Sequence, residues 1–310
     1  EDVTNVDSVG LITARNGVNL SGGQLTVGTG VTIGIAGIAT FRTGRIDVSD
    51  SLNNTSIGEG AGDAYTTGSR NIAIGRNALT ANTTGAYNTA IGYDALEANT
   101  TTSSNTALGY KALTVNTAGD NTAVGYMAMV TNTTGSNNTA VGKNALLTSA
   151  TASNNTAVGH NALTANTGAE NTALGASALG TNTTGANNVA IGVNALLVNT
   201  TGSQNTAVGQ DTLLANTTAA YNVAVGKGAG QSITTGSENT AVGAESLDTN
   251  VSGDTNTAVG YKALEANTDS GNTAVGAYAM FSNTSGSDNS ALGKSALGAN
   301  TTGDFNCAFG

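Results

Sequence analysis

Residues 88–104 read NTAIGYDALEANTTTSS, and variants of this unit fill most of the 310-residue chain. The spacing between units is 17 residues, with three steps of 16. The consensus is N-T-A-V-G-x-x-A-L-x-x-N-T-T-G-x-x, and positions are numbered here from its first asparagine. That asparagine recurs at Asn54, Asn71, Asn88, Asn105, Asn121, Asn138, Asn155, Asn171, Asn188, Asn205, Asn222, Asn239, Asn256, Asn272, Asn289 and Asn306. A short period rich in β-branched residues and glycine, without a helical stripe, predicts a β-solenoid.

The composition excludes several other classes of protein. The chain contains 43 glycines and no proline, so it cannot be collagen, which needs both. Hydrophobic residues make up 38% of the chain, too many for a disordered segment of this modest net charge of −10. No run of about 20 apolar residues is present, so we expect no membrane insertion by a helix. The acidic balance disfavours nucleic acid as a partner.

The repeat predicts an all-β fold in which parallel coils of 16–17 residues stack along one axis. We expect two strands in each coil, at positions 1–5 and 8–12, because the 16-residue units lose their residue after position 12, and length varies in turns. The predicted solenoid spans residues 54–310. Residues 1–53 lack the repeat but contain short apolar runs between glycines, which indicate a separate β-rich shaft or collar segment.

Alternation along a strand assigns side chains to two faces. Position 4 is always Ile, Val, Leu or Phe, and we therefore predict that positions 2 and 4 point inward. Position 3 would then point outward, yet it is alanine in every repeat but the first, which suggests close contact with another chain. The predicted trimer face comprises Ala73, Ala90, Ala107, Ala123 and Ala140.

Two further positions are expected to hold the stack together. Glycine is invariant at position 5, where a side chain would clash or the backbone angle φ would be positive. Asparagine occupies position 12 in 12 of 15 repeats, and stacked side-chain amides can form a ladder. The predicted structural ladder includes Asn82, Asn99, Asn116, Asn132, Asn166, Asn182, Gly75, Gly92 and Gly109.

A search for chemistry finds no catalytic constellation and no spacing typical of metal ligands or a phosphate loop, so we expect neither an enzyme nor a cofactor. The single histidine, His160, falls at a variable turn position, and Cys307 takes an inward position as a small buried side chain. Tyr93, Tyr110 and Tyr126 share position 6 on successive coils and should stack, either as turn packing or as a strip that binds glycans. We also expect ion pairs between adjacent coils, namely Glu59 with Arg76, Asp94 with Lys111 and Glu245 with Lys262.

The runs Asn188-Val189-Ala190-Ile191-Gly192 and Asn71-Ile72-Ala73-Ile74-Gly75 resemble the head repeats of trimeric autotransporter adhesins. The resemblance covers residues 54–310, although the repeat here is longer than the family's. It implies a left-handed β-roll in a homotrimer that serves surface adhesion. The N-terminal stretch, residues 5–17, together with Gly37-Ile38-Ala39-Thr40-Phe41, is similar to tail-fibre proteins of marine bacteriophages.

These resemblances imply an extracellular fibre, on a virion tail or as a cell-surface appendage. We expect a structural shaft that associates with itself and projects a receptor-binding tip. Any host glycan or receptor would then be bound by parts outside this chain. One alternative is a glycan-binding module acting through its exposed turns. A weaker alternative is ice binding, which inward-pointing threonines would exclude.

Overall fold

The computed structural model describes residues 50–310. The chain divides into two units, residues 1–47 and 48–310, and the described residues belong to the second. The expected β-rich segment at residues 1–53 therefore lies outside the described residues, apart from its last four.

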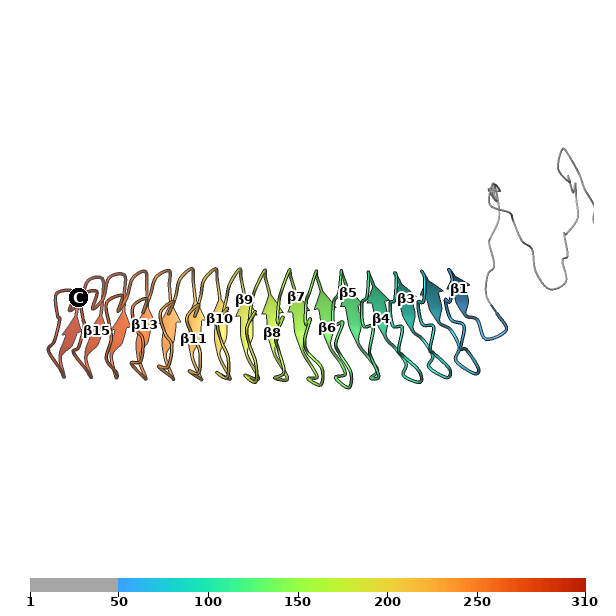
Figure 1. Ribbon diagram of the computed structural model, residues 1–310. Coiled ribbons are helices and arrows are strands. Elements are labelled where there is room, and N and C mark those ends of the chain that lie inside the picture. Colours follow the sequence, from blue (N-terminus) through green and yellow to red (C-terminus); the bar gives the residue numbers. More distant parts are fainter. Residues whose placement is uncertain (1–49) are drawn as a thin grey trace, which may run out of the picture. The chain divides into compact units, whose positions relative to one another are not determined.

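Sixteen three-residue strands follow one another along the described chain, one in each coil (Figure 1). Each strand covers positions 2–4 of the repeat. Their bounds are β1 Thr55–Ile57, β2 Ile72–Ile74, β3 Thr89–Ile91, β4 Thr106–Leu108, β5 Thr122–Val124, β6 Thr139–Val141, β7 Thr156–Val158, β8 Thr172–Leu174, β9 Val189–Ile191, β10 Thr206–Val208, β11 Val223–Val225, β12 Thr240–Val242, β13 Thr257–Val259, β14 Thr273–Val275, β15 Ser290–Leu292 and β16 Cys307–Phe309.

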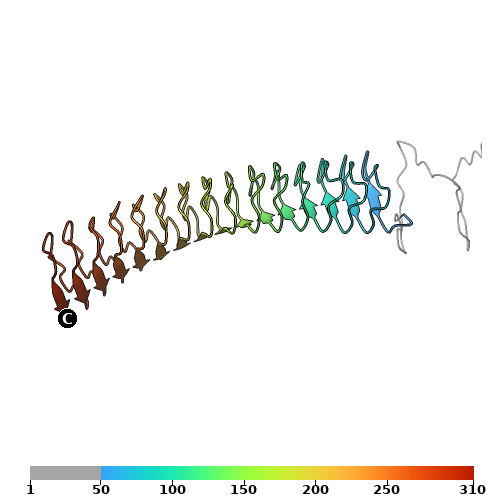
Figure 2. The ribbon, with the colours of Figure 1, turned by 90° about the horizontal axis from the view of Figure 1, so that it is seen from below.

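The strands form one parallel sheet in sequence order, from β1 to β16. Equivalent positions pair directly, as in the column Val124, Val141 and Val158. The 16-residue coils keep this register, because their missing residue lies outside the strand. The strands turn progressively from one end of the sheet to the other (Figure 2), as expected for a twisted sheet. The prediction of an all-β parallel solenoid is confirmed.

The predicted second strand is wrong. Positions 8–12 contain no strand: positions 8–11 form turns, and the leucine at position 9 has a positive φ, 50° at Leu96 for example. A left-handed leucine costs about 1–2 kcal/mol. Burial of the side chain, which is 0% exposed at Leu96, contributes roughly 1.5–3 kcal/mol in return. The Leu96 N–H also donates to the Ala112 carbonyl of the next coil. Burial and the hydrogen bond thus outweigh the backbone preference.

The predicted facing of the strand is wrong as well. Ala73, Ala90, Ala107, Ala123 and Ala140 are all 0% exposed within the single chain, so they cannot form a trimer face. Positions 2 and 4 point outward instead. The predicted alternation is present with the opposite phase, because the interior is thin. The position-3 side chain faces the alanine of position 8 and the leucine of position 9, and the space that remains fits only a methyl group.

The asparagine at position 1 forms a buried spine through the whole solenoid. In each of the fifteen steps from Asn54 to Asn306, its Oδ1 accepts the backbone N–H of the equivalent asparagine in the next coil, at 2.8–3.1 Å. Its Nδ2 commonly donates to a carbonyl at the end of its own coil, as Asn71 does to Gly85 at 2.9 Å. One side chain therefore joins neighbouring coils and also closes its own coil.

The position-12 asparagines form the predicted amide ladder in segments. Asn99 donates to Asn82 at 3.0 Å, Asn132 to Asn116 at 2.7 Å and Asn182 to Asn166 at 2.6 Å. The ladder breaks where Ser149 replaces asparagine, and there the Asn132 Oδ1 and the Ser149 hydroxyl are buried without a partner.

The invariant glycine at position 5 is required for two reasons. At Gly125 φ is +139°, a conformation that other residues rarely adopt. A Cβ placed there would also lie 2.5 Å from the Gly142 carbonyl oxygen of the next coil. Gly75, Gly92 and Gly109 have the same conformation and the same close approach.

We expect Gly125→Ala to destabilise the protein by about 3 kcal/mol or more, since strain in φ adds to a clash with rigid backbone. Gly180→Ala is the matched control, because a Cβ there meets the mobile end of Leu197 at 3.1 Å and the Ser177 carbonyl at 3.1 Å. Its effect should stay within about 1 kcal/mol. Denaturant unfolding followed by circular dichroism compares the two variants, and equal losses would contradict the explanation.

Ser149→Asn should stabilise the protein by about 1 kcal/mol, because it supplies the missing amide between Asn132 and Asn166. Ser149→Ala serves as the control, since it removes an unpaired hydroxyl without extending the ladder. The melting temperatures of the three proteins test this. A Ser149→Asn variant no more stable than Ser149→Ala would show that the ladder contributes nothing here.

Candidate functional site

The outward face of the sheet is an unusual surface for a single chain. Each strand presents two side chains there, most often a threonine at position 2 and an aliphatic residue at position 4. Several of these are well exposed, including Ile57 at 49%, Leu108 at 44% and Leu174 at 48%. Because the strands pair in register, each position forms a straight column, and we call the two columns together the strand face.

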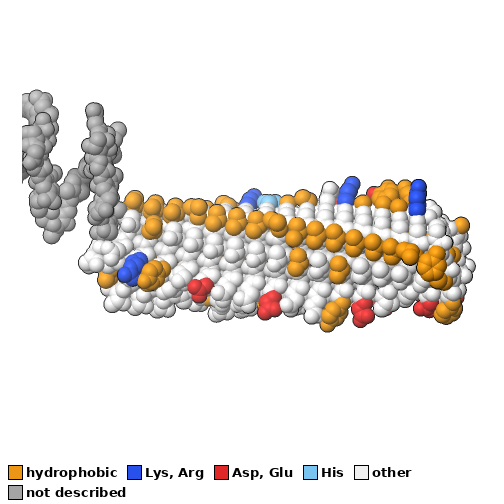
Figure 3. Space-filling view, turned by 180° about the vertical axis from the view of Figure 1, so that it is seen from behind, with side chains coloured by type: hydrophobic (Ala, Val, Ile, Leu, Met, Phe, Trp, Pro, Cys, Tyr) orange, Lys and Arg blue, Asp and Glu red, His pale blue; other side chains and the backbone are white. Residues whose placement is uncertain are grey.

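Figure 3 shows a continuous stripe of hydrophobic side chains running along the solenoid. It corresponds to the position-4 column, which is aliphatic from β1 to β15 and ends in Phe309. The neighbouring column of threonines is interrupted by exposed aliphatic residues such as Ile72 and Val223, each 39% exposed. Sixteen rungs of about 4.8 Å make this stripe roughly 70 Å long. A contiguous apolar surface of that extent is typical of an interaction site.

The three tyrosines at position 6 form the predicted ladder. Tyr93 and Tyr110 stack with ring centroids 5.5 Å apart, and Tyr110 and Tyr126 with centroids 5.1 Å apart. Arg76 lies over the Tyr93 ring at 5.6 Å, and Lys143 over the Tyr126 ring at 5.9 Å. Since these cations come from the coils before and after the ladder, they cover its two outer ring faces.

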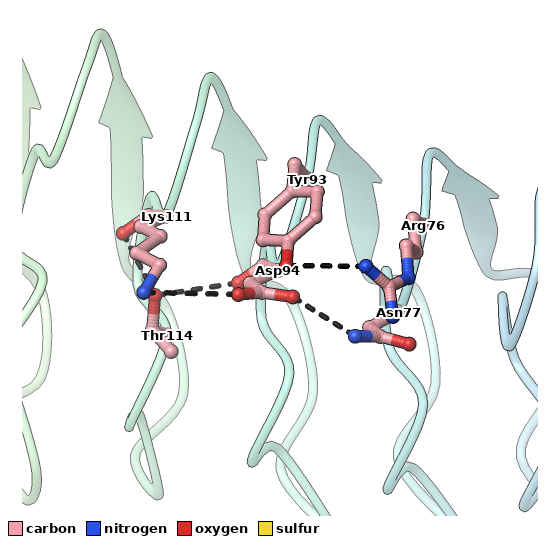
Figure 4. A network of polar contacts seen from close by, with 6 residues as sticks. All are labelled: Arg76, Asn77, Tyr93, Asp94, Lys111 and Thr114. Atoms are coloured by element: carbon pink, nitrogen blue, oxygen red, sulfur yellow. Dashed lines mark hydrogen bonds and ion pairs between the residues drawn. The ribbon is translucent and has the colours of Figure 1, made fainter.

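Polar contacts anchor one end of the ladder (Figure 4). Asp94, buried beside Tyr93, accepts a hydrogen bond from Asn77 Nδ2 at 3.1 Å and pairs with Lys111 at 3.8 Å. The Thr114 hydroxyl donates to the Lys111 carbonyl at 2.9 Å, and Arg76 pairs with Glu59 at 3.4 Å. The predicted ion pairs Glu59–Arg76 and Asp94–Lys111 are thus confirmed.

The ladder offers ring edges and hydroxyl groups to solvent, because its ring faces are covered. Exposed fractions of 39%, 40% and 48% for Tyr93, Tyr110 and Tyr126 fit this arrangement. Sugars usually bind aromatic side chains through the flat ring faces. The geometry therefore favours packing between turns over the glycan-binding strip.

A second charged cluster lies in the turns that follow β12 and β13. Lys262 pairs with Glu245 at 3.1 Å, as predicted, and also with Glu265 at 2.8 Å. Hydrogen bonds to Glu265 and Glu245 raise the pKa of the Lys262 ammonium group. Burial raises the pKa of the Asp248 carboxyl, and the charges of Glu265 and Glu245 raise it further. This crowding of carboxylates around one lysine is a half-buried charge network that joins two neighbouring turns.

The remaining candidates carry no chemistry in residues 50–310. His160 is exposed, as expected for a turn residue. Cys307 is exposed and faces outward from β16, so the prediction of a buried packing residue is wrong for the same reason as the alanine face. Within the described residues, no group of three or more His, Cys, Asp or Glu side chains could hold a metal ion. Nor does this part of the chain contain a helix long and apolar enough to cross a membrane.

The residues that sequence reasoning missed are those of the strand face itself and the asparagine spine beneath it. The signal for the spine was present, since position 1 is asparagine in all sixteen repeats. Comparison with known proteins adds nothing to the site, because no family model, no curated protein and no solved structure matches the chain.

Tyr110→Ala should destabilise the protein by about 1–2 kcal/mol, because it removes two stacked ring pairs. Tyr110→Phe keeps the stacking and loses only an exposed hydroxyl, so its stability should match the wild type. Denaturant unfolding distinguishes the two. If both variants unfold like the wild type, the ladder does not contribute to packing.

Proposed function

We propose that this protein is the structural shaft of a homotrimeric fibre, displayed on a virion tail or a cell surface, that projects a receptor-binding tip. The observation that carries the proposal is the strand face, an exposed aliphatic stripe that extends from β1 to the end of the sheet. In water such a stripe is stabilised by burial against another surface, at roughly 25 cal/mol per Å² of apolar area. A second and third copy of the same chain offer surfaces of equal length.

The trimer therefore assembles through positions 2 and 4 rather than through the alanines. Alanine instead packs the interior of each chain, which frees the larger aliphatic side chains for contact between chains. The resemblance of the repeat to adhesin heads supports three chains rather than two. A rod of this kind needs no catalytic group, since its work is to hold a tip at a distance from the surface that bears it.

Ice binding is a second candidate because the threonine column points outward, which removes the earlier objection to it. The position-4 column argues against it. Its side chains vary in size between Val124, Leu108 and Phe309, which would give a recognition surface for a crystal lattice an uneven height. Variation among aliphatic residues is ordinary in a packed interface. Glycan binding through exposed turns has less support, since the tyrosine ring faces are covered.

The mass of the protein in solution tests the proposal. Light scattering should give three times the 30.2 kDa chain mass. The double variant Val141→Asp and Val158→Asp, which places charges on neighbouring rungs of the strand face, should be monomeric. Val198→Asp, an exposed valine on another side of the coil, should remain trimeric.

A folded wild-type monomer at micromolar concentration would contradict the trimer. Circular dichroism of each variant shows that the solenoid itself is intact. If the monomer also depressed the freezing point of water below its melting point, ice binding would replace the fibre as the better interpretation.

A further inference from the structure

The two edges of the strand face carry opposite charges. One edge is formed by positions 6 and 7, which follow the glycine after each strand, and its basic residues are Arg76, Lys111, Lys143, Lys227, Lys262 and Lys294. The other edge is formed by positions 16 and 17, before each strand, and its acidic residues are Asp120, Glu170, Glu238, Asp254, Asp288 and Asp304. We call these the basic edge and the acidic edge. Figure 3 shows most of the basic side chains on one side of the hydrophobic stripe and most of the acidic ones on the other.

Ion pairs within the chain leave unpaired lysines on the basic edge and unpaired carboxylates on the acidic edge. On the basic edge, three of the four acids, Glu59, Asp94 and Glu245, are each paired with a cation of that same edge. The fourth, Asp211, accepts hydrogen bonds from Asn194 and Gln210 instead. The lysines left without an ion pair among residues 50–310 are Lys143, Lys227 and Lys294. None of the six carboxylates of the acidic edge has an ion-pair partner in the described residues either, and all six residues are exposed. The one cation of that edge, Arg70, lies over the Tyr87 ring at 5.2 Å.

From this distribution we infer that copies of the chain associate side by side with their long axes parallel, the basic edge of one copy against the acidic edge of the next. The inference rests on the proposed fibre and adds the orientation of its partner. When parallel copies direct their strand faces toward a common axis that runs along the solenoid, the basic edge of each copy lies beside the acidic edge of its neighbour. When two copies pack face to face in antiparallel orientation, each edge meets its own kind.

The heights of the charges along the solenoid agree with parallel packing. Lys227 and Glu238 lie in the same coil, between β11 and β12, and Lys294 and Asp304 both lie between β15 and β16. Lys143 follows β6, and the nearest acid, Asp120, precedes β5. Each unpaired lysine thus finds a carboxylate of the next copy within about one coil of its own height, without any shift between copies.

Antiparallel packing with aligned ends brings like charges together. Lys143 follows the sixth of sixteen strands and Lys227 the eleventh, so the two lysines would face each other at the same height. Exposed ion pairs contribute little individually. Complementary charge at a rim nevertheless selects the orientation of partners, because juxtaposed like charges are costly. The apolar strand face supplies affinity, and the edges decide which way the neighbour points.

Charge reversal tests the inference in the full-length chain. One variant reverses the basic edge (Lys143→Glu, Lys227→Glu, Lys294→Glu), and a second reverses the acidic edge (Asp120→Lys, Glu238→Lys, Asp304→Lys). At low salt each should raise the concentration of half-assembly about tenfold or more, and high salt should reduce the effect. The variant with all six changes should assemble like the wild type, because it restores opposite edges. Equal assembly by all three, or failure of the sixfold variant to recover, would overturn the inference.

Cysteine cross-linking reports the orientation directly. Cys307 is exposed on the outward side of β16, so parallel copies bring these thiols together near the common axis. Antiparallel copies would hold them roughly 70 Å apart. Oxidation with copper–phenanthroline and oxygen should give a disulfide-linked dimer on a non-reducing gel.

A second reporter separates failure of this inference from failure of the proposed fibre. Thr172→Cys in a Cys307→Ser background places the thiol on β8, near the middle of the sheet, where it meets its copy in either orientation. Cross-linking through Thr172→Cys without cross-linking through Cys307 would overturn parallel packing and leave the fibre standing. Absence of both, in a protein of monomeric mass, would overturn both proposals.

Discussion

The whole solenoid depends on one side chain, the asparagine at position 1. A coil of 17 residues that buries one leucine and a few alanines cannot offset the entropy of ordering its backbone, at roughly 1–2 kcal/mol per residue. It becomes stable only when every coil is bonded to the next. The position-1 Oδ1 bonds the backbone of the following coil in all fifteen steps, and Nδ2 commonly closes the coil from inside, as at Asn71 and Asn188. A shorter or apolar side chain could do only part of this.

The spine explains why the interior is small and why the exterior is apolar. Because most coils direct two asparagines inward, little volume is left between the walls, and alanine is the residue that fits at position 3. The strand must then direct its β-branched side chains outward, where they create the strand face. The packing of a thin coil thus produces an apolar surface whose exposure to water is unfavourable in a monomer. Such a surface is typical of an interaction site, which fits association of copies.

Charged residues border the strand face on both sides. The residues of the turns on either side of each strand vary from coil to coil, and their charges are mostly basic on one edge and mostly acidic on the other. Local pairs such as Arg76 with Glu59 link adjacent coils and leave only part of each edge unpaired. An apolar stripe bordered by complementary edges can combine affinity, which comes from area, with orientation, which comes from charge.

The sequence by itself determined the period, the parallel stacking, the glycine turn, the position-12 ladder and the ion pairs between coils, because each needs only residues one repeat apart. The tertiary structure alone decided which face of the strand is buried. Alternation fixes that Thr89 and Ile91 share a side opposite Ala90, but not which side is the interior. That choice depends on the volume left by Asn88, Asn99 and Leu96 across the coil. The same dependence turned the expected second strand into a left-handed turn and placed Cys307 on the surface.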